Sequence, residues 1–284
     1  MKLFNYLKYD LRQGLHQTKW CLLGIALFAA SSCSDLYYGK NGYFMGIGAV
    51  PVKATFFDYL FYLLKGMPEF IPDRDMIFKL PIRWFLFQIC YLVGILYYPQ
   101  RDLQNSIGMT VIVKGESRKA WWMSKCIWSV LYILAVYAIV YIVIGCHCLV
   151  KGEILGLYFT SWLAEEYMGV YLLAGVSEKR LLLYFFIVPV AVSISMSIFE
   201  LLIGTLTKPI IGFLLTVFYL LLSSYKLSPF LLGNYMMGVR SSFFIENGVM
   251  AEMGIGLSLW SMCLFIFIGR VFFRKKDILS MSEL

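Results

Sequence analysis

Long apolar runs alternate with short polar connections along almost the whole chain. About 20 apolar residues cross the ~30 Å hydrocarbon core of a bilayer, and a slightly shorter run can cross with help from its flanks. Most of the runs are long enough, whereas the fifth depends on its flanks. The pattern predicts an all-α polytopic membrane protein with six transmembrane helices, at Trp20–Leu36, Ile82–Tyr98, Ser124–Val150, Leu181–Leu206, Ile210–Tyr225 and Ile255–Phe273.

A seventh apolar stretch, Ile154–Val176, has Glu165 and Glu166 at its centre. An acidic residue in the middle of a transmembrane helix costs about 2.5–3.5 kcal/mol. A seventh crossing would also place Lys208 and the basic residues 274–276 on the outer side. We therefore expect this segment to lie on the outer face.

The flanking Lys and Arg residues set the orientation. With the N-terminus inside, basic residues clearly exceed acidic ones on the inner side and balance them on the outer side, as the positive-inside rule requires. The net charge of +8 then reflects topology and contact with anionic lipids rather than nucleic-acid binding. Only 15% of the residues are charged and 60% are hydrophobic. We expect a single transmembrane domain over residues 1–284 of a multi-pass cell-membrane protein, with both termini cytoplasmic.

Two amphipathic segments are predicted beside the apolar runs. Residues 1–18 place Lys8 and Arg12 on a different face from a set of apolar residues at helical spacing, which indicates an elbow helix lying in the inner interface. A leader cleaved before Cys33 is a less favoured alternative. Residues 56–65 show the same pattern and predict a helix resting on the outer leaflet. The apolar sets are Leu3, Phe4, Leu7, Leu11 and Leu15, and Phe56, Phe57, Leu60, Phe61 and Leu64.

The segment before the last run, residues 225–254, is apolar but interrupted by Pro229, Gly233, Gly238 and Gly248. Each piece is too short to cross a bilayer. Irregular backbone at membrane depth must be buried in protein or line a cavity. We expect broken half-helices that form an outer re-entrant segment, with an apolar surface loop as the alternative.

The longest inner connection, residues 101–123, follows the second apolar run. Asp102 can cap a short helix through Leu103 and Ile107, which Gly108 ends, and Ser117 can cap the next helix. The sequence predicts a short helix with a small apolar face that projects into the cytoplasm. A solvated hairpin is the alternative.

The order of these elements resembles that of permease subunits of type-2 ABC exporters, including those that accompany bacterial antibiotic and peptide export. The likeness covers nearly the whole chain and is carried mainly by the loop RDLQNSIG…KGESRKAWWMSK and the tail FFRKKDIL. The resemblance implies that the short helix docks into a separate cytoplasmic ATPase subunit. The coupling residues would be Arg101, Asp102, Leu103, Asn105 and Ile107.

The family resemblance also implies that this chain is a transport subunit and not an enzyme. It contains no GxxxxGK[ST] phosphate loop, so ATP and Mg²⁺ would be bound by the partner ATPase, and no cofactor is expected in the chain itself. Six helices form half a pathway in that family, so a second permease half, the same or a related chain, is expected as a dimer partner. The expected cargo is an amphipathic peptide, antibiotic or lipid-like molecule, moved outward.

Glu200 is the candidate site residue inside the membrane, because an ionisable group in a span usually faces a cavity or a partner. An ion pair with Lys208 is the alternative. The same run carries small residues at four-residue spacing, for which packing within the subunit is favoured: Ala191, Ser193, Ser195 and Ser197.

Two other functions stay open. One is a membrane-embedded enzyme acting on lipid, with Glu200 or the pair Glu165 and Glu166 as acid–base groups. The other is a structural or sensory membrane subunit. No catalytic or metal-binding residues are assigned, since the adjacent residues 146–148 (Cys-His-Cys) cannot readily surround one metal ion.

Overall fold

The computed structural model describes residues 2–72, 77–98, 117–173 and 177–275. Within these ranges the chain is all-helical and contains no β-strand, which confirms the predicted helical class. The helices are α1 (Lys2–Gly46), α2 (Phe56–Leu64), α3 (Ile82–Tyr97), α6 (Arg118–Lys151), α7 (Ser161–Glu166), α8 (Glu178–Leu206), α9 (Pro209–Tyr225), the 3₁₀ turns η1 (Leu232–Met236) and η2 (Gly238–Arg240), and α10 (Ala251–Lys275).

Four helices in the described part of the chain are long and apolar enough to cross a membrane: α1, α6, α8 and α10. The second and fifth predicted spans correspond to α3 and α9, which are apolar but only 16 and 17 residues long. The residues between α6 and α8 contain only the six-residue α7, and Glu165 and Glu166 on it are exposed. The expectation that this segment is not a seventh crossing therefore agrees with the structure.

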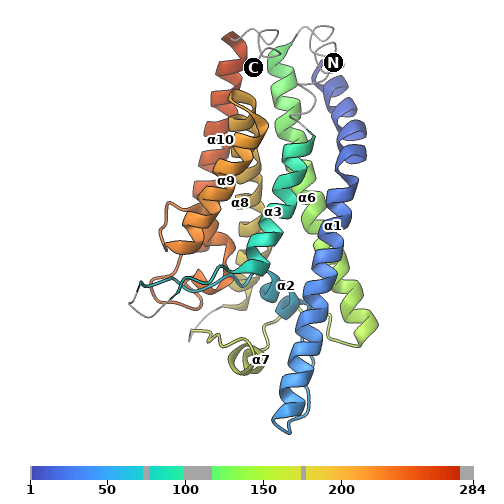
Figure 1. Cartoon of the computed structure of the whole chain (residues 1–284), viewed down its shortest axis with the longest axis vertical. Coiled ribbons are helices and arrows are strands. Elements are labelled where there is room, and N and C mark those ends of the chain that lie inside the picture. The colour runs from blue at the N-terminus through green and yellow to red at the C-terminus, as the bar shows by residue number, and fades with distance from the viewer. Residues whose placement is uncertain (1, 73–76, 99–116, 174–176, 276–284) are drawn as a thin grey trace.

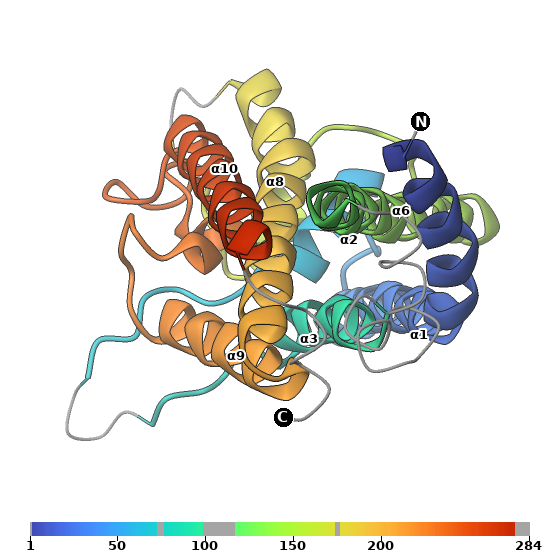
Figure 2. The same ribbon diagram turned by 90° about the horizontal axis from the view of Figure 1, so that it is seen from above.

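The long helices run alternately along one axis of an elongated molecule (Figure 1). The start of α1, the end of α3, the start of α6, the end of α8 and the end of α10 lie together at one end, here called the near end; α2 and α7 lie toward the other, the far end. In the view along the axis, α1, α3 and α6 form one half and α8, α9 and α10 form the other (Figure 2). The α8 helix joins the halves, because it packs against α3 and α6 as well as against α9 and α10.

The α1 helix is continuous from residue 2 to residue 46, so a separate elbow helix over residues 1–18 is not confirmed. Gly14 does not end the helix. Its Cβ position would lie 2.1 Å from Nε1 of Trp128, so the missing side chain lets α6 approach closely. The predicted apolar face is only partly turned away from the bundle, since Phe4 is 70% exposed whereas Leu11 packs against the core. The face that packs inward carries Tyr6, Asp10, Gly14 and Thr18.

The prediction that residues 56–65 rest on the outer leaflet is wrong. The α2 helix forms, but most of its side chains are buried. Asp58 is fully buried and closes a capping box with Thr55. Its second carboxylate oxygen accepts a hydrogen bond from the backbone N–H of Thr160 at 3.0 Å. Because a partner 102 residues away satisfies the carboxylate, both faces of this helix can be buried.

Residues 225–254 are broken and largely buried, but their described helices are the two 3₁₀ turns instead of α half-helices. Close packing explains the irregular path, since a Cβ at Gly233 or Gly238 would lie 2.5 Å from Ser223 or 2.7 Å from the Phe185 ring. Arg240 is buried at the centre of this segment. Its guanidinium donates to the carbonyl oxygens of Met67 at 2.9 Å and Pro68 at 3.1 Å, and also to those of Ser223 and Ser224 at the end of α9. We call this segment the far-end cap.

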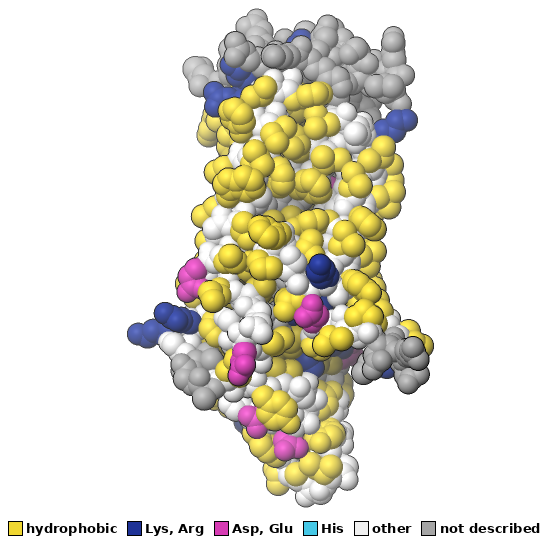
Figure 3. All heavy atoms as spheres, turned by 90° about the vertical axis from the view of Figure 1, so that its left-hand side faces the viewer, with side chains coloured by type: hydrophobic (Ala, Val, Ile, Leu, Met, Phe, Trp, Pro, Cys, Tyr) yellow, Lys and Arg dark blue, Asp and Glu magenta, His cyan; other side chains and the backbone are white. Residues whose placement is uncertain are grey.

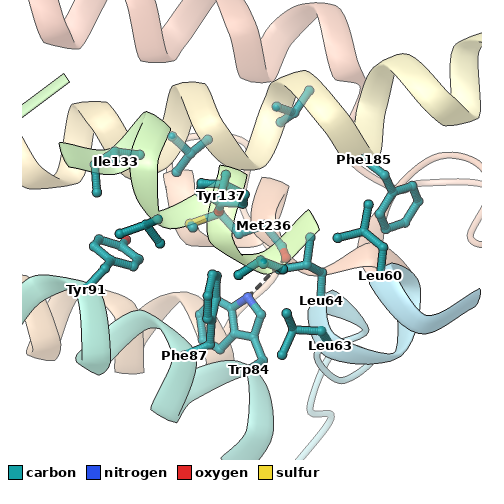
Figure 4. Close-up of a cluster of buried hydrophobic side chains, with 14 of the residues drawn as sticks. Leu60, Leu63, Leu64, Trp84, Phe87, Tyr91, Ile133, Tyr137, Phe185 and Met236 are labelled. Carbon is teal, nitrogen blue, oxygen red and sulfur yellow. Dashed lines mark hydrogen bonds between the residues drawn. The ribbon is translucent and has the colours of Figure 1, made fainter. Parts of the chain in front are cut away.

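The surface and the core differ less in polarity than in a water-soluble protein. Hydrophobic side chains cover most of the shaft on the face shown in Figure 3, and the charged side chains lie near its upper end and over its lower half. The interior is filled by aromatic and aliphatic side chains of α2, α3, α6 and α8 around Trp84, whose indole N–H donates to the Met236 carbonyl at 3.0 Å (Figure 4). An apolar exterior of this kind is what lipid contact requires.

Candidate functional site

Glu200 lies on α8 about two turns before the helix ends and is completely buried. The α9 helix covers the backbone of this turn: a Cβ at Gly212 would lie only 2.7 Å from the Glu200 carbonyl oxygen. The first residues of α9 therefore close the site from one side, and α3 and α6 close it from another, since both pack on α8.

The carboxyl group of Glu200 has no hydrogen-bond partner for either oxygen among the described residues. The alternative partner, Lys208, is exposed at the N-cap of α9 and forms no ion pair with it. A buried carboxyl without a partner is costly in either protonation state, and the ionised form is the costlier. The alternative of an ion pair between Glu200 and Lys208 is therefore not observed among the described residues.

Four further polar side chains lie on α8 and on the two helices α3 and α6 that pack against it, and together with Glu200 we call them the polar layer. Each is buried and has at least one side-chain polar atom without a hydrogen-bond partner in the described part of the chain. The layer consists of Gln88 and Tyr91 on α3, Tyr132 on α6, and Ser197 and Glu200 on α8.

The members of the polar layer come from three helices that face one another. Glu200 is within electrostatic range of the hydroxyl groups of Tyr91 and Tyr132. Tyr91 points from α3 toward Ile133 of α6 (Figure 4). The Tyr132 hydroxyl lies against the backbone of α3, where a Cβ at Gly94 would be 1.9 Å away. The layer therefore occupies the junction of the two halves of the bundle.

Two serines of α8 near the layer have side-chain partners on other helices. Ser193 forms a hydrogen bond of 2.9 Å with the Tyr137 hydroxyl on α6, and Ser195 forms one of 2.7 Å with Ser261 on α10. These pairs confirm the expectation that the small residues of this run pack within the subunit. In contrast, the polar layer offers donors and acceptors that its own helices leave unused, and these groups can bind a polar ligand or exchange partners when the halves move.

A second group of buried polar residues lies at the near end, and we call it the Asp10 cluster. The Lys125 ammonium lies 2.6 Å from Oδ1 of Asp10, and the Tyr98 hydroxyl donates to the same oxygen at 2.8 Å. The Ser124 hydroxyl donates to Oδ2 of Asp10. The ammonium also lies 4.6 Å from the centre of the Tyr98 ring. Charge-assisted hydrogen bonds of this kind are roughly twice as strong as neutral ones.

The Asp10 cluster holds both ends of the connection between α3 and α6. Tyr98 is the C-cap residue of α3, and Ser124 and Lys125 lie in the second turn of α6. Ser117 caps α6 as predicted, with its side chain accepting from the Ala120 N–H. The helix includes residues 118–123, which had been assigned to the connection. The predicted coupling residues Arg101, Asp102, Leu103, Asn105 and Ile107 lie outside the described residues.

Neither Asp10 nor Lys125 was singled out from the sequence, and the Asp10 cluster was therefore missed. A signal was present. Asp10 shares a helix face with Tyr6, Gly14 and Thr18 at four-residue spacing, and not with Lys8 or Arg12. A carboxylate on a face of small and aromatic residues indicates a buried partner.

The other candidate chemistry is not assembled. Glu165 and Glu166 lie on α7 toward the far end, whereas Glu200 lies toward the near end (Figure 1). Cys146 is exposed and Cys148 is buried, and both are free thiols. No group of three or more His, Cys, Asp or Glu residues able to hold a metal ion occurs in the described ranges.

Any function assigned to this chain depends on its sequence and on the geometry of the polar layer and the Asp10 cluster. Comparison with family models, curated proteins and solved structures finds no match to this chain.

Proposed function

We propose that this chain is the membrane-spanning permease subunit of an ATP-driven ABC exporter. A separate cytoplasmic subunit would bind Mg²⁺ and ATP and hydrolyse the nucleotide, and a second permease half, the same or a related chain, would complete the pathway. The cargo would be an amphipathic peptide, antibiotic or lipid-like molecule moved outward across the cell membrane.

The proposal treats α3 and α9 as crossings in addition to the four long helices. At 1.5 Å per residue they extend about 24–26 Å, so the adjoining residues must complete the span. Both helices alternate in direction with their long neighbours (Figure 1). Six crossings then put the start of α1 and the end of α10 on one side, the near end. The basic flanks Lys8, Arg12, Lys119 and Lys208 support placing that side in the cytoplasm.

The Asp10 cluster is the observation that carries the proposal. A permease without its own phosphate loop must be driven by a partner that binds it on the cytoplasmic side. In this chain the longest cytoplasmic connection is residues 99–116. Its two ends are tied to α1 through the Asp10 carboxylate, which Tyr98 and Lys125 both contact. A displacement of the connection would therefore move α1, α3 and α6 together relative to the other half of the bundle.

The polar layer supports the same proposal. It lies where α3 and α6 meet α8, which is the boundary between the two halves. Partners that change during a rocking motion must not be locked in permanent hydrogen bonds, and these groups are not. Glu200 would be the intramembrane residue whose environment changes between the inward-open and outward-open states.

The test is a purification in mild detergent from the native membrane, with co-purifying proteins identified and ATP hydrolysis measured. The variant Leu103→Asp, Ile107→Asp changes the predicted apolar face of the short helix, and the control Gln104→Asp adds a single acidic side chain beside that face. We expect an ATPase subunit to accompany the native chain and the control, and to be lost from the double variant.

A chain that purifies without an ATPase and does not stimulate ATP hydrolysis, with the 99–116 connection intact, would overturn the proposal. Lipid turnover by the purified chain without ATP would instead establish the membrane-embedded enzyme. If the double variant still binds the ATPase and still stimulates ATP hydrolysis, the predicted apolar face does not form the contact with the ATPase.

A further inference from the structure

A cavity of about 340 Å³ lies at the far end, between the end of α2 and the start of α3. Its walls include Leu63 and Trp84, which face each other across this junction (Figure 4). Tyr167 and Met168, which follow α7, close another side. The volume is at the small end of the range for ligand pockets, enough for a compact head group and not for a whole lipid.

Two cations line this cavity, Lys65 and Arg83, and no carboxylate is among its described lining residues. The Arg83 guanidinium lies 4.0 Å from the centre of the Tyr62 ring, which also lines the cavity. The first residues of α3 form part of the wall, so the positive end of its helix dipole adds to the same sign of potential. The cavity is therefore electropositive with aromatic walls.

Neither cation is neutralised by a strong internal partner in the described part of the chain. The Lys65 ammonium donates to the Met168 carbonyl at 2.5 Å, which uses one of its three N–H groups. Arg83 pairs with Asp35 at 3.3 Å, but Asp35 is 57% exposed, and exposed pairs of this kind contribute at most about 1 kcal/mol. Burial, together with the charge of Arg83, lowers the pKa of Lys65. An anion in the cavity would relieve this repulsion.

An apolar surface continues from the cavity along α3. Ile82 is 64% exposed and Leu86, one turn further, is 42% exposed, so both present a ridge to the surroundings. Tyr62 and Tyr167, which also line the cavity, are of a residue type enriched at membrane–water interfaces. A ligand with an anionic head and a hydrocarbon chain could place its head among the cations of the cavity and pack its chain along the ridge.

We propose that this cavity binds the phosphate-bearing head group of an anionic lipid, held by Lys65 and Arg83, with its acyl chain along Ile82 and Leu86. The proposal is independent of the export function, because it requires only that the far end of α3 lies at a membrane–water interface. A phosphate oxygen would accept hydrogen bonds from the free ammonium N–H groups and from the guanidinium fork.

The test is native mass spectrometry of the full chain in a neutral detergent, titrated with phosphatidylglycerol or with phosphatidylcholine of the same acyl chains. The variants are Lys65→Gln, Arg83→Gln and their combination. Lys53→Gln is the matched control, because Lys53 is an exposed cation shortly before α2 that does not line the cavity. We expect one tightly bound phosphatidylglycerol, weakened about tenfold by each single change and unaffected by the control.

Inorganic phosphate separates a lipid site from a site for a free anion. For a lipid site, millimolar phosphate should leave the bound phosphatidylglycerol in place, because the ridge holds the chain. Displacement by phosphate alone would overturn the lipid assignment, and so would equal binding of phosphatidylcholine or native affinity in the double variant. If the double variant does not fold, Arg83→Glu at the partly exposed position gives the same test, and undiminished phosphatidylglycerol binding by that variant would overturn the proposal.

Discussion

The ammonium of Lys125 lies 2.6 Å from the carboxylate of Asp10 in a site where both side chains are almost completely buried. This pair joins the third turn of α1 to the second turn of α6, although the two residues are 115 positions apart. A buried pair resists separation of its partners because each charge left alone would face a large desolvation cost. The near end of the bundle is therefore stabilised by a buried ion pair in addition to apolar packing.

Removal of one partner of this pair should destabilise the protein far more than removal of both. Lys125→Met leaves the Asp10 carboxylate buried without its cation, and we expect a loss of about 3–5 kcal/mol. The double variant Asp10→Leu, Lys125→Met should recover most of that loss. Thermal unfolding in detergent measures the difference, and Lys8→Met, an exposed position two residues from Asp10, should change it by less than about 0.5 kcal/mol.

The double variant also separates stability from coupling. If the Asp10 cluster transmits movement from the 99–116 connection, the folded double variant should bind its ATPase but stimulate ATP hydrolysis poorly. Equal losses of stability in the single and double variants would contradict the interaction between Asp10 and Lys125. Full stimulation of ATP hydrolysis by the double variant would contradict a role of the Asp10 cluster in coupling.

Two glycines of α1 should respond in opposite directions to the same substitution. A Cβ at Gly14 would collide with Trp128 and with Tyr98, whereas a Cβ at Gly24 meets nothing within 4 Å. Gly14→Ala should therefore destabilise the α1–α6 contact by about 1–3 kcal/mol. Gly24→Ala should stabilise the helix by up to about 1 kcal/mol, because alanine has the higher helix propensity. Unfolding of both variants under one condition checks the pair, and stabilisation by Gly14→Ala would contradict the close approach.

The positions of the helices were largely predictable because the length of an apolar run is a local property. The predicted run Ser124–Val150 lies within α6, and the runs at residues 82–98 and 210–225 match α3 and α9 closely. The end of α1 was not predictable in this way. The first predicted run ended at Leu36, but α1 continues past Lys40, whose ammonium is buried against Glu153 at 2.8 Å. That partner follows α6 in the chain.

Of the candidate site, only Glu200 could be predicted from the sequence, because an acidic residue is unusual in an apolar run. Glu200 is an acid in an apolar run, which the sequence displays directly. Its neighbours Tyr91 and Tyr132 are ordinary aromatic residues in apolar helices, and nothing local distinguishes them from core residues. Their role follows from the packing of α3 and α6 on α8, which is a property of the tertiary structure.

The far-end cap should depend on Arg240. The guanidinium is buried and satisfies the carbonyl oxygens of Ser223 and Ser224 that the end of α9 leaves free. Burial lowers the pKa of Arg240 to about 10, so the side chain stays charged at neutral pH. Arg240→Met removes these bonds and should cost about 3 kcal/mol. Limited proteolysis after residue 225 should then become faster, with Arg180→Met, an exposed position, as the control.

Glu200 should be dispensable for stability and necessary for activity. Its carboxyl is buried and unpaired in the described structure, so Glu200→Leu removes a desolvation cost and replaces it by apolar packing of similar volume. We expect an unchanged or higher unfolding temperature, together with a severalfold loss of cargo-stimulated ATP hydrolysis. Ser195→Ala on the same helix removes a satisfied hydrogen bond to Ser261 and should instead cost about 1 kcal/mol with little effect on turnover. A fall in unfolding temperature for Glu200→Leu would mean that the carboxyl has a structural partner. Full activity of that variant would exclude Glu200 from the transport cycle, because no other ionisable side chain contributes to the polar layer at neutral pH among its described members.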